Sequence, residues 1–245
     1  MAANFFTVSG ATSDSNPINS GIVTAAFPAT SFVCGNAVVY SGKSYATVLI
    51  GSQCWFKENL NVGTTIIPPG TMPTNNGIIE KWCNGSDSAI HTTSGDCAVY
   101  GGLYSWNEAM GYVTTPGAQG ICPAGWHIPT DAEQYTLENY LKDSGQPCDP
   151  NRNESDTGAS SCATAASKLS LFTSGGNNSS GWTGLLAGFR MYDSYFYYRN
   201  YFGYWWSSTQ SGGSAWNRLM WTTSSGVARC VFDKVNGFSV RCIKN

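Results

Sequence analysis

Apolar residues occur in short runs through the first part of the chain. Such runs cover residues 37–40, 44–50 and 54–56, and glycine or Ser-Gly turns separate them. This pattern is typical of strands joined by tight turns, so we expect a β-meander here. The preceding residues 1–33 are rich in Ser, Thr, Asn and Ala and show weak periodicity, which indicates an N-terminal arm or linker.

Two segments in the middle of the chain carry the signature of a helix start. Ser105 and Thr130 each precede a glutamate by three residues. In this spacing the hydroxyl caps an amide and the carboxylate returns to the cap residue. After Thr130, apolar and aromatic residues follow at helical spacing until Gly145, so we expect a helix of about three turns that ends at this glycine. A shorter helix is expected over residues 162–169.

The pattern becomes β-prone again after Trp182. We expect the last strands over residues 205–208, 216–221, 227–232 and 238–243. Strands, then two or three short helices, then further strands predict an α+β fold with mixed or antiparallel sheets and long loops. The region 64–95 carries Pro-Pro-Gly and Asn-Gly turn signals, which predict surface excursions.

The segment 189–206, FRMYDSYFYYRNYFGYWW, follows neither period. It holds eight aromatic residues in the thirteen positions from Tyr192 to Tyr204, so rings would lie on both faces of a strand and all around a helix. We expect an irregular, tyrosine-rich surface segment. Tyrosine offers a large rigid contact area, and its hydroxyl can hydrogen-bond to water in the free protein and to a ligand in the bound one. The alternative is that these rings fill the core of a loop-rich domain.

Composition narrows the classes of function. Charged residues make up only 11% of the chain, the formal net charge is −2, and no basic run could neutralise a phosphate backbone, so a nucleic-acid partner is not expected. No apolar stretch approaches the roughly 18 residues of a membrane span, and the first residues lack the pattern of a signal peptide. We expect neither membrane insertion nor an export signal within this chain.

Nine cysteines without any CxxC pair indicate disulfides rather than metal ligands, which is typical of an oxidising exterior. Cys83 and Cys97 bracket the end of the loop region, so they are a candidate local disulfide. Cys148 and Cys162 bracket a polar excursion and are a second candidate. Because nine is odd, at least one cysteine is unpaired within the chain.

Several motifs occur together in this chain. In order they are GSQCWFKENLN (51–61), GGLYSWNEAM (101–110), CPAGWHIPTDAEQYTLENYL (122–141), GLLAGFR (184–190), YWWSST (204–209), AWNR (215–218) and GFSVRCIKN (237–245). The set resembles the Fibrobacter succinogenes major paralogous domain family over roughly residues 34–245. That family is similar to the C-type lectin fold group, which also holds formylglycine-generating enzymes and the variable proteins of diversity-generating retroelements.

The resemblance implies a C-type lectin-like domain over residues 34–245, with a variable region at about residues 190–235. In the variable proteins, adenine replacement in AAC codons can give Tyr, Asp, Phe, Leu or Cys, but not Trp, so Trp221 does not fit this rule. The implied ligand-binding surface comprises Tyr192, Asp193, Tyr195, Tyr197, Tyr198, Tyr201, Phe202, Tyr204, Asn217, Leu219, Trp221, Cys230 and Phe232.

The resemblance also guides the remaining cysteines. We expect Cys122 to pair with Cys242, which ties the segment before the main helix to the last strand and closes most of the domain into one loop. Cys34 with Cys54 is expected as a further pair. Cys230 is then the odd thiol, introduced by diversification.

No catalytic residue, metal or cofactor is expected. His127 matches the family motif and is expected to be packed and hydrogen-bonded rather than a base. The tripeptides 146–148 and 216–218 superficially resemble the calcium loops of sugar-binding lectins, but they lack the aspartate that would neutralise the ion, and Arg218 would repel it.

Three hypotheses follow. The favoured one is a non-enzymatic binding protein on a cell or virion surface, with a protein or glycan on a target surface as its ligand. The second is a structural or self-associating surface module. The third is an enzyme of the formylglycine-generating type, which requires a close pair of reactive thiols; Cys230 and Cys242 are twelve positions apart, so this hypothesis is the weakest.

Overall fold

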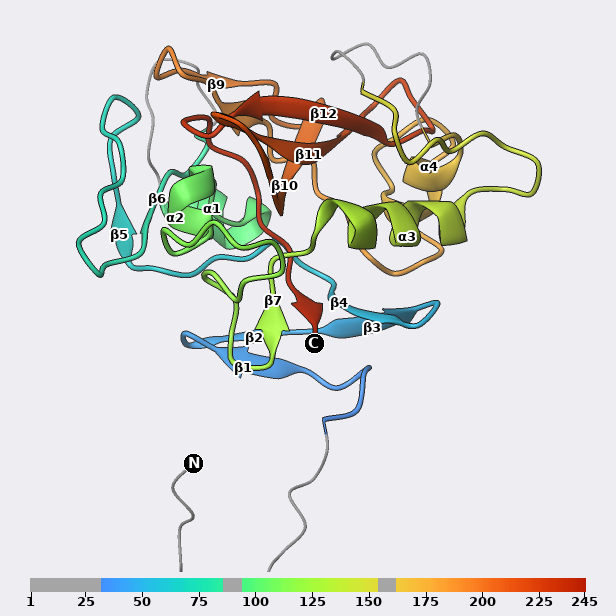
Figure 1. Cartoon of the computed structure of the whole chain (residues 1–245), viewed down its shortest axis with the longest axis horizontal. Coiled ribbons are helices and arrows are strands. Elements are labelled where there is room, and N and C mark those ends of the chain that lie inside the picture. The colour runs from blue at the N-terminus through green and yellow to red at the C-terminus, as the bar shows by residue number, and fades with distance from the viewer. Residues whose placement is uncertain (1–31, 86–93, 154–161) are drawn as a thin grey trace, which may run out of the picture. The chain divides into compact units, whose positions relative to one another are not determined.

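The longest helix lies between two sheets. Helix α3 (Asp131–Leu141) and helix α4 (Ala165–Leu169) pack on an apolar cluster that receives side chains from both sheets, among them Trp55, Trp205 and Met220. This computed structural model describes residues 32–85, 94–153 and 162–245, and Val33–Asn245 form one compact unit (Figure 1). The arm expected over residues 1–33 lies, except for its last two residues, outside the described part.

The start of α3 is as predicted. The Thr130 hydroxyl accepts a hydrogen bond from the Glu133 amide at 3.2 Å, and the Thr130 amide donates to the Glu133 carboxylate at 2.8 Å, which completes a capping box. The helix ends at Leu141 because Lys142 leaves the helical conformation, with ψ at 153°. Gly145, at a φ of +78°, lies in the following turn and does not terminate the helix.

The described residues hold two further helices. In α2 (Trp106–Ala109) the Ser105 hydroxyl caps the Glu108 amide as predicted, but the Glu108 carboxylate does not return to Ser105. It accepts instead from the Glu80 amide at 2.9 Å and the Tyr112 hydroxyl at 2.9 Å, because tertiary contacts offer it other donors. Helix α1 (Ser94–Tyr100) has no predicted counterpart.

The lower sheet in Figure 1 has four strands in the order β3–β4–β13–β7, all antiparallel: β3 (Thr47–Ile50), β4 (Gln53–Phe56), β13 (Ile243–Lys244) and β7 (Trp126–His127). The strand expected over residues 44–50 is interrupted at Ala46, whose amide donates to Glu58 and whose carbonyl accepts from Lys57. Residues before Ala46 therefore form a separate hairpin of β1 (Val38–Tyr40) and β2 (Lys43–Tyr45).

The upper sheet consists of β10 (Phe202–Ser211), β11 (Ser214–Trp221) and β12 (Ala228–Asp233), paired antiparallel in chain order. Because side chains alternate along a strand, this sheet has two different faces. One face turns toward α3 and carries residues such as Arg218 and Met220. We call the opposite face, which carries Phe202, Tyr204, Trp206, Asn217, Leu219, Trp221, Cys230 and Phe232, the aromatic sheet face.

Two segments differ from prediction. Only Ile243–Lys244 of the expected last strand is regular, because Phe238 bridges to Tyr104 and Ser239 to Trp205, so successive residues pair with different neighbours. The region 64–95 is not all surface loop: β5 (Thr65–Ile66) and β6 (Glu80–Lys81) pair in parallel, and the following Trp82 is fully buried.

All four expected disulfides are present. They join Cys34 to Cys54, Cys83 to Cys97, Cys122 to Cys242 and Cys148 to Cys162. Cys230 takes part in none of them and is buried. Short helices and mostly antiparallel sheets make the fold α+β, as predicted.

Candidate functional site

The tyrosine-rich segment forms a short hairpin, which we call the aromatic hairpin (residues 188–202). Strands β8 (Phe189–Arg190) and β9 (Phe196–Tyr197) pair antiparallel. In the turn between them the Asp193 carboxylate accepts a hydrogen bond from the Tyr195 amide at 3.0 Å and one from the Tyr197 hydroxyl at 2.6 Å. The hydrogen bond from Tyr197 to Asp193 and the charge of Asp193 raise the pKa of Tyr197 to about 12.

A second turn connects β9 to the upper sheet. Its Tyr198 carbonyl accepts from the Tyr201 amide at 3.0 Å and the Phe202 amide at 2.9 Å, and the Asn200 amide donates to the Leu186 carbonyl at 2.8 Å. Tyr198 and Asn200 have φ angles of +54° and +69°, in the left-handed region that side-chain-bearing residues adopt uncommonly. These main-chain contacts hold the turn in that conformation.

Four tyrosines of the hairpin face solvent. Tyr192 is 64% exposed, Tyr195 54%, Tyr198 57% and Tyr201 61%, and we call these four the exposed tyrosines. Asp193 beside them is also exposed. Four other residues of the expected contact surface are half-buried at its margin: Tyr197, Phe202, Trp221 and Phe232. The expectation of outward-facing rings on this segment therefore agrees with the fold for most of its tyrosines.

Four residues of the expected contact surface are interior and require a correction. Tyr204 is 2% exposed, Cys230 1%, and Asn217 and Leu219 0%. They lie on the aromatic sheet face, which Phe189 and Phe238 cover: the rings of Tyr204 and Phe238 are 4.7 Å apart, and those of Tyr204 and Phe189 are 4.8 Å apart. In this fold these four side chains cannot touch a ligand on the surface.

A buried arginine holds the aromatic hairpin in place. Arg190 is 1% exposed, and its guanidinium donates to the carbonyls of Pro69 and Val235 and to the Ser194 hydroxyl. It also lies 4.5 Å from the centre of the Trp82 ring. Burial lowers the pKa of Arg190 from its ordinary value, against the opposing charge of Asp193. Three loops thus meet on one side chain that is not part of the exposed surface.

Close packing also fixes the start of the hairpin. Gly188 has a φ of +67°, and a Cβ there would come within 2.2 Å of the Tyr197 carbonyl oxygen. Its amide donates to the Phe202 carbonyl at 2.7 Å. Phe196, 3% exposed, points inward between the exposed Tyr195 and the half-buried Tyr197. The inward residues and the main chain define the hairpin, and the exposed rings project from it.

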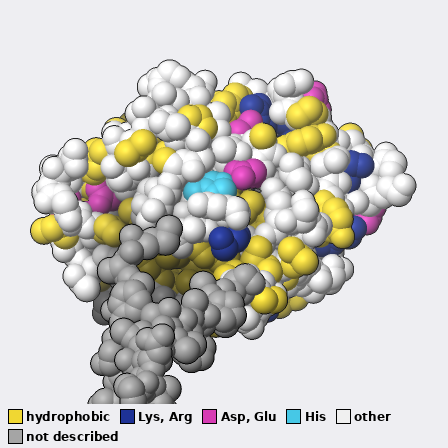
Figure 2. Space-filling view, turned by 60° about the horizontal axis from the view of Figure 1, so that its bottom comes forward, with side chains coloured by type: hydrophobic (Ala, Val, Ile, Leu, Met, Phe, Trp, Pro, Cys, Tyr) yellow, Lys and Arg dark blue, Asp and Glu magenta, His cyan; other side chains and the backbone are white. Residues whose placement is uncertain are grey.

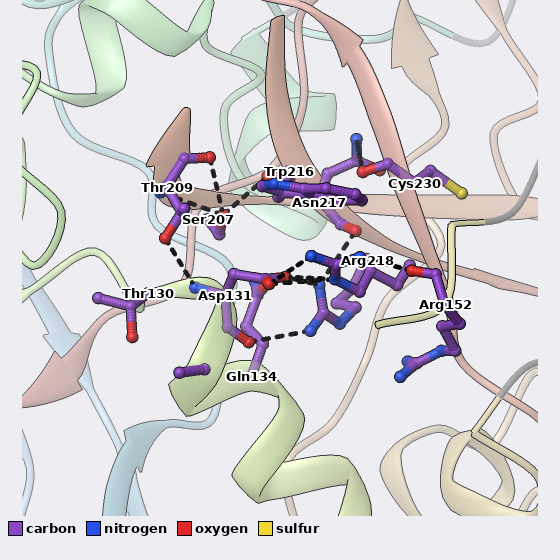
Figure 3. A network of polar contacts seen from close by, with 12 residues as sticks. Thr130, Asp131, Gln134, Arg152, Ser207, Thr209, Trp216, Asn217, Arg218 and Cys230 are labelled. Carbon is purple, nitrogen blue, oxygen red and sulfur yellow. Dashed lines mark hydrogen bonds and ion pairs between the residues drawn. The ribbon is translucent and has the colours of Figure 1, made fainter. Parts of the chain in front are cut away.

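The other face of the upper sheet holds a buried ionic network (Figure 3). Asp131 accepts from Arg218 at 2.7 Å and from Arg229 at 2.8 Å, while Glu138 accepts from Arg218 and Arg152. Burial raises the pKa of Asp131, but the hydrogen bonds from Arg229 and the charge of Arg218 outweigh burial and hold it below its ordinary value. The network lies under α3 rather than in an open cleft, so it fastens the helix to the sheet.

The prediction from sequence missed this network. The sequence pattern assigns the glutamate after Thr130 to helix capping and gives Asp131 no role beyond its place in the first turn of the helix. The usable signal was that Arg218 and Arg229 each fall in an expected strand, where they prove to be direct cross-strand neighbours. Two like charges placed opposite one another destabilise a sheet unless a carboxylate lies between them, and Asp131 fills this role.

His127 is packed and hydrogen-bonded, as predicted. Its ring lies 3.0 Å from the Glu133 carboxylate and 2.7 Å from Asn245 Oδ1. Burial lowers its pKa, but the hydrogen bonds with Glu133 and Asn245 outweigh burial and raise it above the ordinary value.

On the face shown in Figure 2, charged side chains are sparse and a histidine lies against an acidic side chain.

One group in the described part of the chain has the composition of a metal site. Glu138, Cys148 and Cys162 place one ligand atom each within 4.8 Å of one another. The two cysteines are bonded to each other, and Glu138 is paired with Arg152 and Arg218. Because metals bind the thiolate rather than the disulfide, this donor set does not suit an ion.

No described helix has the length and apolar character needed to cross a membrane.

Only one of the three comparisons with known proteins finds a match. No curated protein and no solved structure matches the chain. The model of the Fibrobacter succinogenes major domain matches residues 48–244, which is most of the chain and includes α3, both sheets and the aromatic hairpin. The protein therefore belongs to the Fibrobacter succinogenes major domain family.

Proposed function

We propose that this protein is a non-enzymatic binding protein of the receptor or adhesin type, with an aromatic contact surface on a C-type lectin-like scaffold. The contact surface comprises the exposed tyrosines Tyr192, Tyr195, Tyr198 and Tyr201, together with Asp193 and the half-buried margin residues Tyr197, Phe202, Trp221 and Phe232. One observation carries this proposal. Arg190, Phe196 and main-chain hydrogen bonds fix the conformation of the hairpin, whereas the exposed tyrosines project from it into solvent.

The chemistry of this surface suits recognition. A cluster of large exposed rings is uncommon on a surface that contacts only water. Tyrosine loses little side-chain entropy on binding, because it has only two torsions to restrict. Its hydroxyl can hydrogen-bond both in the free protein and in the complex. The ligand is a protein or glycan on a target surface.

The scaffold also suits exposure outside the cell. Four disulfides are typical of a protein that folds in an oxidising compartment. We place the protein on a cell or virion surface, or in the extracellular medium. The enzyme alternative requires a close pair of reactive thiols, but Cys242 is bonded to Cys122, so it offers no thiol to Cys230. This supports the binding function over the formylglycine-generating type.

The binding proposal can be tested on arrays of purified surface proteins and surface glycans. A variant with serine at all four exposed tyrosine positions should lose at least about tenfold in its strongest array signal, while its melting temperature stays within a few degrees of the wild type. A matched control, Tyr140→Ser, changes a tyrosine that is 64% exposed on α3, away from the hairpin, and should keep the signal. A collapse of the melting temperature in the fourfold variant would mean that these rings belong to the core.

We further propose that a retroelement diversifies this surface. The DNA beside the gene should then contain a reverse transcriptase gene and a near-copy of the 3′ end of the coding sequence that differs only at adenines. The differing codons should include those of the exposed tyrosines. Flanking DNA without such a copy would remove the diversification and leave the binding proposal standing.

The same exposed rings could instead dock on a second copy of the chain. Sedimentation velocity distinguishes this alternative, because self-association through the surface would give an oligomer at micromolar concentration that the fourfold serine variant reverts to monomer. A wild-type monomer that still binds its array ligand would exclude the self-associating module.

A further inference from the structure

An open groove runs beside the second turn of the aromatic hairpin. It has a volume of about 300 Å³, at the lower end of the size of small-molecule sites. Its lining residues are Asn84, Gly85, Phe196, Tyr197, Tyr198, Arg199, Asn200 and Tyr201. Two of the exposed tyrosines, Tyr198 and Tyr201, therefore border the groove, whereas Tyr192 and Tyr195 lie outside it.

The groove offers uncharged hydrogen-bonding groups. Within the described residues, the hydroxyls of Tyr198 and Tyr201 bond to no other group. Asn200 is exposed, and its side-chain oxygen accepts from the Tyr100 hydroxyl at 2.5 Å, while its side-chain amide nitrogen donates to no other described residue. The groove thus combines exposed ring faces with phenol and amide groups that a ligand can reach.

The charged groups near the groove are already engaged. Arg199 donates to the Asn84 carbonyl at 3.0 Å and lies 5.4 Å from the centre of the Tyr100 ring. The Asp193 carboxylate accepts from Tyr197 and from a main-chain amide. An anionic or cationic ligand would have to displace these contacts, whereas a neutral polar ligand would not.

From this geometry we propose that the groove binds a neutral pyranose residue of a glycan, without a metal ion. A pyranose has one face of C–H bonds bordered by hydroxyls, so the C–H face packs on the rings of Tyr198 and Tyr201 while the hydroxyls bond to the phenols and to Asn200. This inference rests on the proposed binding function and names the ligand class for one part of its surface.

The test uses the full chain and a panel of neutral oligosaccharides made of glucose, mannose, galactose or N-acetylglucosamine in α and β linkages. Saturation-transfer NMR and calorimetric titration should detect binding of at least one probe, unchanged by a metal chelator. Tyr198→Ala/Tyr201→Ala should weaken binding of this probe at least about tenfold, and Tyr198→Phe/Tyr201→Phe, which keeps the rings, should weaken it less. The matched control Tyr140→Ala, which removes a ring that is 64% exposed on α3 and outside the proposed contact surface, should bind the probe like the wild type, and melting curves should show each variant folded.

Each outcome decides the inference. Absence of binding to every neutral probe, binding that a chelator abolishes, or binding that survives Tyr198→Ala/Tyr201→Ala would overturn it. If the arrays then still report a protein ligand that the fourfold serine variant loses, the proposed function stands and only the glycan assignment falls. If the arrays also report no ligand, both fall.

Discussion

Tyr201 and Tyr204 are three residues apart, yet Tyr201 is 61% exposed and Tyr204 is 2% exposed. Tyr201 lies in the turn before β10, whereas Tyr204 points into the aromatic sheet face beneath Phe238. Tyr204→Ala should therefore lower the free energy of unfolding by about 3 to 5 kcal/mol, and Tyr201→Ala should change it by only about 0.5 kcal/mol. Urea unfolding of both variants measures the contrast, and equal losses would contradict the assignment of Tyr201 to the surface.

The hydrogen bond from Tyr197 to Asp193 makes the aromatic hairpin sensitive to alkaline pH. A phenol whose pKa rises on folding contributes stability that is complete below the unfolded pKa of about 10 and is lost as the pH rises through about 12. Asp193→Asn should return the pKa of Tyr197 toward its ordinary value. NMR titration of ¹³C-labelled tyrosine measures this shift, with Tyr197→Phe identifying the resonance. An unchanged pKa in Asp193→Asn would show that the hydrogen bond is not formed in solution.

Glu138 accepts from both Arg152 and Arg218 and is 1% exposed. Glu138→Gln keeps the shape but leaves two buried guanidinium groups without this charge, so the free energy of unfolding should fall by about 3 to 5 kcal/mol. Asp143→Asn is the control, because it breaks an exposed ion pair with Lys168 and should leave the urea midpoint almost unchanged. Similar midpoints for the two variants would contradict a structural role for the network.

His127 should make stability depend on pH near neutrality. Its pKa is raised on folding, so its contribution is complete below the unfolded pKa of about 6.5 and is lost as the pH rises through the folded value. Glu133, whose pKa is lowered despite burial, contributes stability above its unfolded pKa of about 4.3 that is lost as the pH falls. The difference in urea midpoint between the wild type and His127→Gln should therefore shrink from pH 6 to pH 9. A difference that stays constant over this range would rule out the titration.

The disulfides should differ in their contribution to stability. Cys122 and Cys242 are 120 positions apart, whereas Cys83 and Cys97 are 14 apart. In the chain-entropy model, Cys122→Ala/Cys242→Ala should cost about 4 to 5 kcal/mol and Cys83→Ala/Cys97→Ala about 3 kcal/mol. Thermal and urea unfolding of the two double variants test this order. A larger loss at the short loop would point to strain or packing rather than chain entropy.

Local features were predictable because their partners lie close in the chain. The capping box of α3 joins residues three positions apart, and the disulfide of Cys148 with Cys162 closes a short loop. The pairing of Cys122 with Cys242 spans 120 positions, and it followed from the family resemblance rather than from spacing. An irregular conformation of the segment 189–206 was predictable because the spacing of its rings fits neither a strand nor a helix.

What the sequence determined by itself was the class of fold, the capped helix, the cysteines to be paired and the segment that presents aromatic rings. Tertiary structure alone decided which rings are outside. Tyr204 is the same residue type as the exposed tyrosines, but it lies with Leu219 on a sheet face that Phe189 and Phe238 cover. Tertiary structure also decided that Asp131 binds both Arg218 and Arg229, which lie 87 and 98 positions away from it in the chain. Burial and ion pairing depend on which distant segments meet, and local sequence patterns do not record this.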